Sequence, residues 1–250
     1  MKSSKGSAPV LTGFIFTFCL AFLLSLLPAA AEEPMAKIIK VAGCVWARSQ
    51  VKAPVEEWVR IKTRDYPLYP GDVVKTSSGR AEILFQRDLS LVRVAEDTQL
   101  LLRVAEEKEK GITLRRIFLS RGWIWASINP HTGVQTQFES NAATAGISGT
   151  AIQFWLDSIG TVFVSCIDGG VDVTGNEVKV HLITGQCTRV TLGSEPAFPF
   201  DCVAPPFPTP EGLVPGGCEE VGAEISPPVF VGPTPLFQGT GGGGIASPSK

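Results

Sequence analysis

From Met35 to about Gly193, apolar residues fall into short runs in which they alternate with polar residues, and glycine and polar turn residues separate these runs. In the run 80–85, for example, Ala81, Ile83 and Phe85 occupy every second position. This period of two is expected of a half-buried strand, because successive side chains of a strand point to opposite faces. Helical periodicity is nearly absent from the region, so the pattern predicts an all-β domain.

We assign about ten short strands in this way, separated by turn sequences such as those at 158–160, 168–170 and 174–176. Strands at this spacing are typical of a β-sandwich, a barrel or a short β-solenoid. No strict repeat of about 20 to 50 residues is visible, which makes the solenoid-like alternative less favoured without excluding it.

The N-terminal segment has the pattern of a secretory signal peptide. Lys2 and Lys5 precede an apolar run from Phe14 to Leu27, and small residues lead to Ala31 and the acidic residues after it. An uncleaved signal anchor is the alternative, but the run is shorter than the ~20 residues that span a bilayer. We therefore expect residues 1–31 to be a cleaved signal peptide and the mature protein to be periplasmic or secreted.

The C-terminal segment 201–250 is rich in proline and glycine, including "APPFPTPEG" and "GTGGGG". Proline removes backbone donors and glycine increases the entropy of the unfolded chain, so such a segment gains little by ordering itself. We expect a flexible tail after a β domain at 32–200.

The net charge of the chain argues against nucleic-acid binding. The whole chain has a formal net charge of −2, and cleavage of the signal peptide would remove two lysines and make it more acidic. A mildly acidic chain does not attract nucleic acid.

The stretch "NAATAGISGTAIQF" at 141–154 invites comparison with the nucleophile elbow G-x-S-x-G. In this chain the second glycine follows Ser148 immediately, and alternating β sequence follows where the elbow needs a helix. A serine nucleophile also needs a base, and the two histidines, His131 and His181, read as an exposed turn residue and a strand residue. We expect no catalytic residue here and a structural role for the glycines in a tight connection.

Metal and cofactor sites are not indicated either. The cysteines form no C-x-x-C pair, the histidines are far apart in sequence, and the glycine run near the C-terminus precedes no P-loop lysine. We expect neither a metal nor a cofactor.

Cleavage of the signal peptide would leave five cysteines, so at least one should stay unpaired. Cys202 and Cys218 flank part of the Pro/Gly-rich segment, and we predict a disulfide between them. Cys166 and Cys187 are the next pair in rank, which leaves Cys44 as a buried thiol. The sequence does not fix this ranking.

Trp123 and Trp125 are predicted to share one face of a strand. Large aromatic residues at alternate positions are more often sheet core than a carbohydrate-stacking platform, and we favour core here.

Three longer stretches resemble the FecR domain family: "PLYPGDVVKTSSGRAEILFQRDLSLVRVAEDTQLLL", "LSRGWIWASI" and "NAATAGISGTAIQF". Together with the following strands they cover about 68–190. The positions that fit the family pattern include Gly71, Asp72, Thr76, Gly122, Trp125, Gly146, Ile147, Gly149 and Thr150.

The chain departs from that pattern in three places. Asp88-Leu89-Ser90 stands where Asp-Gly-Ser is usual, Ser148 stands where arginine is common, and Ser140-Asn141 replaces Thr-Pro. Leucine lacks the conformational freedom that glycine would bring to a turn.

The resemblance implies an envelope-exposed, non-enzymatic β domain. In founding members the domain is the periplasmic part of a membrane-spanning regulator that passes the state of an outer-membrane receptor to a cytoplasmic sigma factor. The segment before the apolar run here is too short for a folded sigma-binding domain, so we expect that role not to transfer intact.

Two hypotheses from different classes follow. The first is a module that recognises another envelope protein through an exposed strand edge or loop. The second is a glycan- or cell-wall-binding β module that uses exposed tryptophans as stacking platforms. The candidates for such platforms are Trp46, Trp58, Trp123, Trp125 and Trp155.

Overall fold

The computed structural model describes residues 33–49, 57–107, 112–131 and 133–208. The expected signal peptide and most of the expected tail lie outside these residues. The described part is all-β, as predicted, and contains seventeen strands and no helix. Our expectation of about ten strands is too low, because seven of the strands are only two to four residues long and short strands leave a weak alternation signal.

The strands are β1 (Ala36–Ala42), β2 (Val45–Arg48), β3 (Val59–Arg60), β4 (Tyr66–Leu68), β5 (Val73–Thr76), β6 (Arg80–Phe85), β7 (Leu91–Val94), β8 (Gln99–Glu107), β9 (Ile112–Ile128), β10 (Val134–Glu139), β11 (Thr144–Ile147), β12 (Thr150–Leu156), β13 (Val162–Asp168), β14 (Gly170–Gly175), β15 (Val178–Ile183), β16 (Gln186–Val190) and β17 (Phe200–Asp201).

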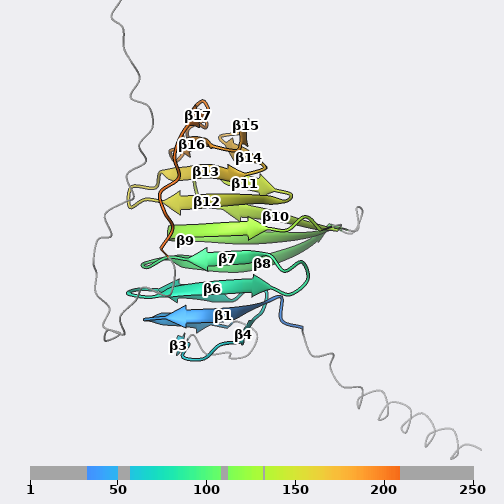
Figure 1. The fold of residues 1–250 in the computed structure, drawn as a ribbon, viewed down its shortest axis with the longest axis vertical. Coiled ribbons are helices and arrows are strands. Elements are labelled where there is room, and N and C mark those ends of the chain that lie inside the picture. Colours follow the sequence, from blue (N-terminus) through green and yellow to red (C-terminus); the bar gives the residue numbers. More distant parts are fainter. Residues whose placement is uncertain (1–32, 50–56, 108–111, 132, 209–250) are drawn as a thin grey trace, which may run out of the picture. The chain divides into compact units, whose positions relative to one another are not determined.

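These strands form two layers (Figure 1). Sheet A has the order β4, β1, β6, β7, second half of β9, β12, β13, β16, β17. Sheet B has the order β3, β2, β5, β8, first half of β9, β10, β11, β14, β15. The pair of β9 and β10 is parallel and the other ladders are antiparallel. The arrangement is a two-layer sandwich in which the strands follow sequence order along both sheets, except at the end formed by β1 to β4.

Strand β9 belongs to both sheets and joins them. Its residues 112–121 pair with β8 in sheet B, and its residues 122–128 pair with β12 in sheet A. The change of layer occurs at Gly122, whose φ of 95° lies in the left-handed region. A Cβ atom at this position would also overlap Thr98, whose hydroxyl accepts a hydrogen bond from the Trp123 N–H at 3.0 Å. Glycine is therefore required at the bend.

One hydrophobic core lies between the sheets. Ala81, Ile83 and Phe85 all point into it and are at most 1% exposed, which confirms the alternation seen in the sequence. Leu100 and Leu102 reach the same core from sheet B. Burial of each large side chain contributes about 1.5 to 3 kcal/mol, so the two inner faces stabilise the sandwich together.

Residues 201–208, which we expected to be part of the flexible tail, are instead attached to sheet A. Asp201 belongs to β17, which pairs with β16, and the N–H of Cys202 donates to the Gly185 carbonyl at 3.0 Å. This pairing places Cys202 beside Cys187, and the two form a disulfide with a Cα–Cα distance of 5.8 Å. The predicted disulfide between Cys202 and Cys218 is therefore wrong.

The register explains why the second-ranked pair, Cys166 with Cys187, is also wrong. Cys187 lies opposite Ser165 in the ladder of β13 and β16. Cys166 is the next residue along β13, so it points to the opposite face, into the core. It is a buried free thiol, and burial together with the charge of Asp168 raises its pKa. Cys44 is disulfide-bonded, so the expectation of a thiol there is wrong as well.

We predict that non-reducing peptide mapping of the oxidised chain recovers a peptide of Cys187 linked to Cys202. Cys166 should be alkylated without reduction only after the chain is unfolded. Substitution Cys202→Ser should lower the free energy of unfolding by about 3 kcal/mol, since the bridge closes a loop with a sequence separation of 15. A Cys202 peptide linked to Cys218 would contradict the assignment.

Candidate functional site

The motif residues before and after β5 make structural contacts. The Asp72 side chain is buried, and its Oδ2 accepts a hydrogen bond from the Tyr69 N–H at 2.9 Å. The Thr76 hydroxyl accepts from the Thr98 N–H at 2.9 Å, and it donates to the Ala95 carbonyl at 2.6 Å. These bonds hold the turn before β5 and tie β5 to the segment between β7 and β8.

The stretch that resembles a nucleophile elbow carries the chain from one layer to the other. Ser148 and Gly149 connect β11 in sheet B with β12 in sheet A, and Gly149 has a φ of 112°. Thr150 then donates through its hydroxyl to the Gly170 carbonyl at 2.7 Å. Gly146 lies inside β11, opposite Asp172, so our expectation that it shapes the connection is wrong.

Ser148 and His131, which the sequence places in separate turns, line the same hollow. The hollow has a volume of about 240 Å³, and Ile128, Asn129 and Ile147 also line it. Sequence reasoning missed this proximity because it depends on how β9 and β11 are placed in the two layers. The other histidine, His181, lies on β15. Its Nδ1 is 2.8 Å from the Oδ1 of Asp172 on the neighbouring strand β14, and both side chains are exposed.

We predict that Gly149→Val lowers the free energy of unfolding by about 1 to 3 kcal/mol, because valine is strained at this φ. Gly146→Ala is the matched control, since a Cβ there would meet only the Asp172 carbonyl oxygen at 3.9 Å. Ser148→Ala should leave stability nearly unchanged. Labelling of Ser148 by a fluorophosphonate probe would contradict a purely structural reading of this connection.

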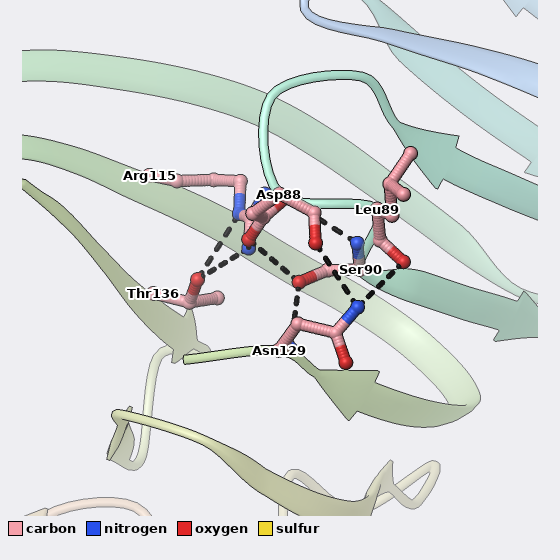
Figure 2. Close-up of polar contacts among 6 residues, drawn as sticks. All are labelled: Asp88, Leu89, Ser90, Arg115, Asn129 and Thr136. Carbon is pink, nitrogen blue, oxygen red and sulfur yellow. Dashed lines mark hydrogen bonds and ion pairs between the residues drawn. The ribbon is translucent and has the colours of Figure 1, made fainter. Parts of the chain in front are cut away.

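A buried polar cluster joins the two sheets where the family pattern has Asp-Gly-Ser (Figure 2). Asp88 lies in the turn between β6 and β7, and its two carboxylate oxygens accept from the Arg115 guanidinium at 3.0 and 2.8 Å. Arg115 belongs to the sheet B half of β9 and also donates to the Thr136 hydroxyl on β10 at 2.6 Å. Its guanidinium lies 4.0 Å from the centre of the Phe85 ring.

The same cluster fixes the turn that contains Leu89. Ser90 donates through its hydroxyl to Asp88 at 2.6 Å and accepts from the Asn129 N–H at 3.0 Å. The Asn129 side-chain amide donates to the carbonyls of Asp88 and Leu89, each at 3.0 Å. Leu89 has a φ of 56°, a conformation that costs a non-glycine residue roughly 1 kcal/mol or more. The hydrogen bonds on both sides hold it there, and its side chain is 64% exposed.

Both charges of the Asp88–Arg115 pair are almost fully removed from water, with side chains that are 1% and 5% exposed. Burial raises the pKa of Asp88. The hydrogen bonds from Arg115 and Ser90 and the charge of Arg115 lower this pKa, and together they outweigh the effect of burial. The pKa therefore lies below its ordinary value of 3.8. A carboxylate whose pKa is lower in the folded state than in the unfolded state stabilises the fold at pH values above its unfolded-state pKa. This contribution is therefore present at neutral pH and is lost as the pH falls below about 3.8 through the pKa of the folded state.

We predict that Arg115→Met lowers the free energy of unfolding by about 3 to 5 kcal/mol, because it leaves a buried carboxylate without its counter-charge. Arg121→Met is the matched control on the same strand. Arg121 pairs with Asp97 at 2.5 Å, but both side chains are at least one-third exposed, so the loss should be under about 1 kcal/mol. Urea denaturation measures both, and equal losses would contradict the prediction. Asp88→Asn combined with Arg115→Met should recover part of the loss, because no buried charge remains.

The tryptophans of β9 are on the outer face of sheet A, so the expectation that they form sheet core is wrong. Ile124 and Ala126 point into the core, and Trp123 and Trp125 point outward and are half-buried. Trp125 lies under the guanidinium of Arg93, 4.6 Å from the centre of its ring system. The two tryptophans do share one face of the strand, as predicted. An alternating pattern alone does not show which of the two faces of a strand is the buried one.

A row of aromatic side chains crosses this outer face. Trp155 of β12 lies opposite Trp123, and Phe163 of β13 lies opposite Trp155. The rings of Trp155 and Phe163 stack with their centres 4.8 Å apart. We call this surface, together with Gln153, the outer aromatic face.

The C-terminal segment 202–208 lies across the outer aromatic face. The Gln153 side-chain amide donates to the Pro205 carbonyl at 2.7 Å, and Phe207 packs edge-on against Trp123 with ring centres 4.6 Å apart. In Figure 1 this segment runs down the front of sheet A from β17 across β12 toward β9.

Trp46 and Trp58, near β2 and β3, are each approached by a cation. The Lys75 ammonium lies 6.0 Å from the Trp46 ring and 5.8 Å from the Trp58 ring, and Arg48 lies 5.2 Å from the Trp58 ring. Cations over these rings compete with a sugar for the same faces.

Strand β15 is the long edge strand of the described sheets. Sheet A ends in β4 and β17, and sheet B ends in β3 and β15, but only β15 has more than three residues. It is joined to β14 by a two-residue turn at Asn176 and Glu177, both with positive φ. With this turn, the N–H and C=O groups of Lys179 and His181 point away from β14. Ile183, at the end of the strand, is 55% exposed.

Among the residues that the structure describes, no helix is long and apolar enough to cross a membrane. The same residues contain no group of three or more side chains arranged to hold a metal ion.

Residues 72–172 match the model of the family described as FecR protein. This match confirms the resemblance found in the sequence and is consistent with a FecR-type domain between Asp72, before β5, and Asp172 in β14. The matched region is less than half of the chain.

No curated protein matches the chain. Two crystal structures of a candidate anti-sigma factor from Parabacteroides distasonis ATCC 8503 are similar to it. The first has 14% identity and a TM-score of 0.42, and the match covers 52% of this chain and 59% of that chain. The second has 15% identity and a TM-score of 0.41, with 51% and 57% covered. The chain thus spans less than two thirds of the structures that it matches.

Proposed function

We propose that this chain is a non-enzymatic interaction module of the FecR type that recognises another protein of the cell envelope, in a regulatory or signalling role. The observation that carries the proposal is strand β15, a six-residue edge with outward-facing backbone groups on a FecR-type β scaffold. An exposed edge of this length is a template for an extended segment of a partner, which would add one more strand to sheet B.

The side chains of β15 support this use of the edge. Lys179 and His181 both lie on the exposed face, next to Asp172, and Ile183 adds an apolar group at the end of the strand. Leu182 points into the core and is fully buried, which anchors the strand. A partner strand would find charged and apolar contacts on one side and backbone donors and acceptors along the edge.

A protein partner is favoured over a glycan because the tryptophans do not form one open platform. Trp123 lies under Phe207, Trp155 stacks on Phe163, and Trp125 lies under Arg93. Trp58 is 37% exposed, but Arg48 and Lys75 lie over its ring.

Site-specific photo-crosslinking tests the proposal on the full exported chain. A crosslinker placed at Lys179 should give a defined protein adduct in the envelope fraction. The same crosslinker at Gln135, an exposed position of β10 in the middle of sheet B, should not give it. Retention of the chain on purified cell-wall glycan, with no protein adduct at Lys179, would replace the proposal with the glycan-binding alternative.

A proline substitution separates the backbone edge from the side chains. His181→Pro removes an outward-facing N–H that a partner strand would need, and it should abolish the Lys179 adduct. His181→Ala keeps that N–H and should preserve the adduct. An adduct that survives His181→Pro in a folded chain, checked by circular dichroism, would contradict docking at this edge.

A further inference from the structure

We propose that the outer aromatic face of sheet A is a docking surface for an extended proline-rich segment of a partner protein, and that residues 204–208 of this chain cover it as an intramolecular ligand. The inference rests on the proposed function as a protein-interaction module. It names a second surface, distinct from the β15 edge, and the chemistry of the segment that this surface accepts.

The covering segment crosses the strands rather than pairing with them. Cys202 starts it beside β16, where the disulfide to Cys187 holds it and its Sγ lies 3.8 Å from the Ser165 hydroxyl of β13. Pro205 then meets Gln153 on β12 at 2.7 Å. Phe207 reaches β9, where its ring packs against Trp123.

The segment has the chemistry of a proline-rich ligand. Its sequence at 204–208 is "APPFP", and prolines restrict the chain to extended conformations before it binds, so little entropy is lost on docking. Pro205 and Phe207 are half-buried against the sheet, whereas Val203 is 80% exposed and Pro206 is exposed. The segment is therefore held by an aromatic ring, that of Phe207 on Trp123, and by the backbone carbonyl of Pro205 on Gln153.

The surface holds two further polar groups that the covering segment does not use. Trp123 Nε1 and Gln153 Oε1 are buried, and neither has a hydrogen-bond partner within the part of the chain that the structure describes. One is a donor and the other is an acceptor, and both belong to residues that the segment contacts. A partner segment that presents a carbonyl to Trp123 and an N–H to Gln153 would satisfy both groups, and it would therefore displace the intramolecular segment.

Phe207 is the residue on which the internal cover depends, so its substitution should open the surface. The probe is a fluorescein-labelled peptide with the sequence of residues 203–210, Val-Ala-Pro-Pro-Phe-Pro-Thr-Pro. Its fluorescence anisotropy is titrated with the full, disulfide-bonded chain. Phe207→Ala should bind the peptide about ten-fold more tightly than the unchanged chain, because the competing internal ligand is weakened.

Phe198→Ala is the matched control, because Phe198 belongs to the same C-terminal region and is 91% exposed. It should bind the peptide as weakly as the unchanged chain. Trp123→Ala added to Phe207→Ala should remove binding, and a peptide with alanine in place of phenylalanine should lose about ten-fold. Circular dichroism and thermal unfolding check that each variant is folded.

Equal peptide binding by the Phe207→Ala and Phe198→Ala chains would overturn the proposal, as would binding that survives Trp123→Ala. If the Phe207→Ala chain forms dimers that the peptide does not dissociate, the occupant is a second copy and the assignment to a partner is wrong. These outcomes leave the β15 crosslinking result unchanged, so a failure here is distinguishable from a failure of the proposed function.

Discussion

The ion pair between Asp88 and Arg115 is the constraint on which the sandwich depends most. It links a turn of sheet A to the sheet B half of β9, and Asn129, which directly follows the other end of β9, binds the same turn. One turn thereby holds both halves of the strand that changes layer. Buried charges are costly to desolvate, so this arrangement stabilises the fold only while every member of the cluster is in place.

The two sheets that β9 joins present different surfaces to solvent. After Gly122 the strand exposes Trp123 and Trp125 on the outside of sheet A, where 202–208 cover part of that aromatic surface. Sheet B ends in β15, and the outward N–H and C=O groups of Lys179 and His181 pair with no other described strand. The two surfaces most suited to a partner thus lie on different sheets. Two of the FecR-type motif glycines, Gly122 and Gly149, lie where the chain passes from sheet B to sheet A.

The sequence predicts the all-β class and the alternation within strands because both are local properties. The positive φ at Gly149 also agrees with a turn that local sequence suggests. Facts that depend on which segments are neighbours in space could not be predicted. The pairing of Cys202 with Cys187 follows from β17 lying beside β16, and the outward direction of Trp123 follows from Ile124 facing the core. The sequence around Arg115 gives no sign of its buried partner, because Asp88 is 27 positions away along the chain.

The order of the strands has a consequence for how the chain reaches this structure. Beyond β4, each new strand joins the growing edge of sheet A or sheet B. A chain that emerges from its N-terminus can therefore add strands to an existing edge while the remainder is still being made, instead of waiting for distant segments. The cover at 202–208 has no complete surface to bind until β9, β12 and β16 have formed, so the outer aromatic face is open throughout assembly and closes in the last step.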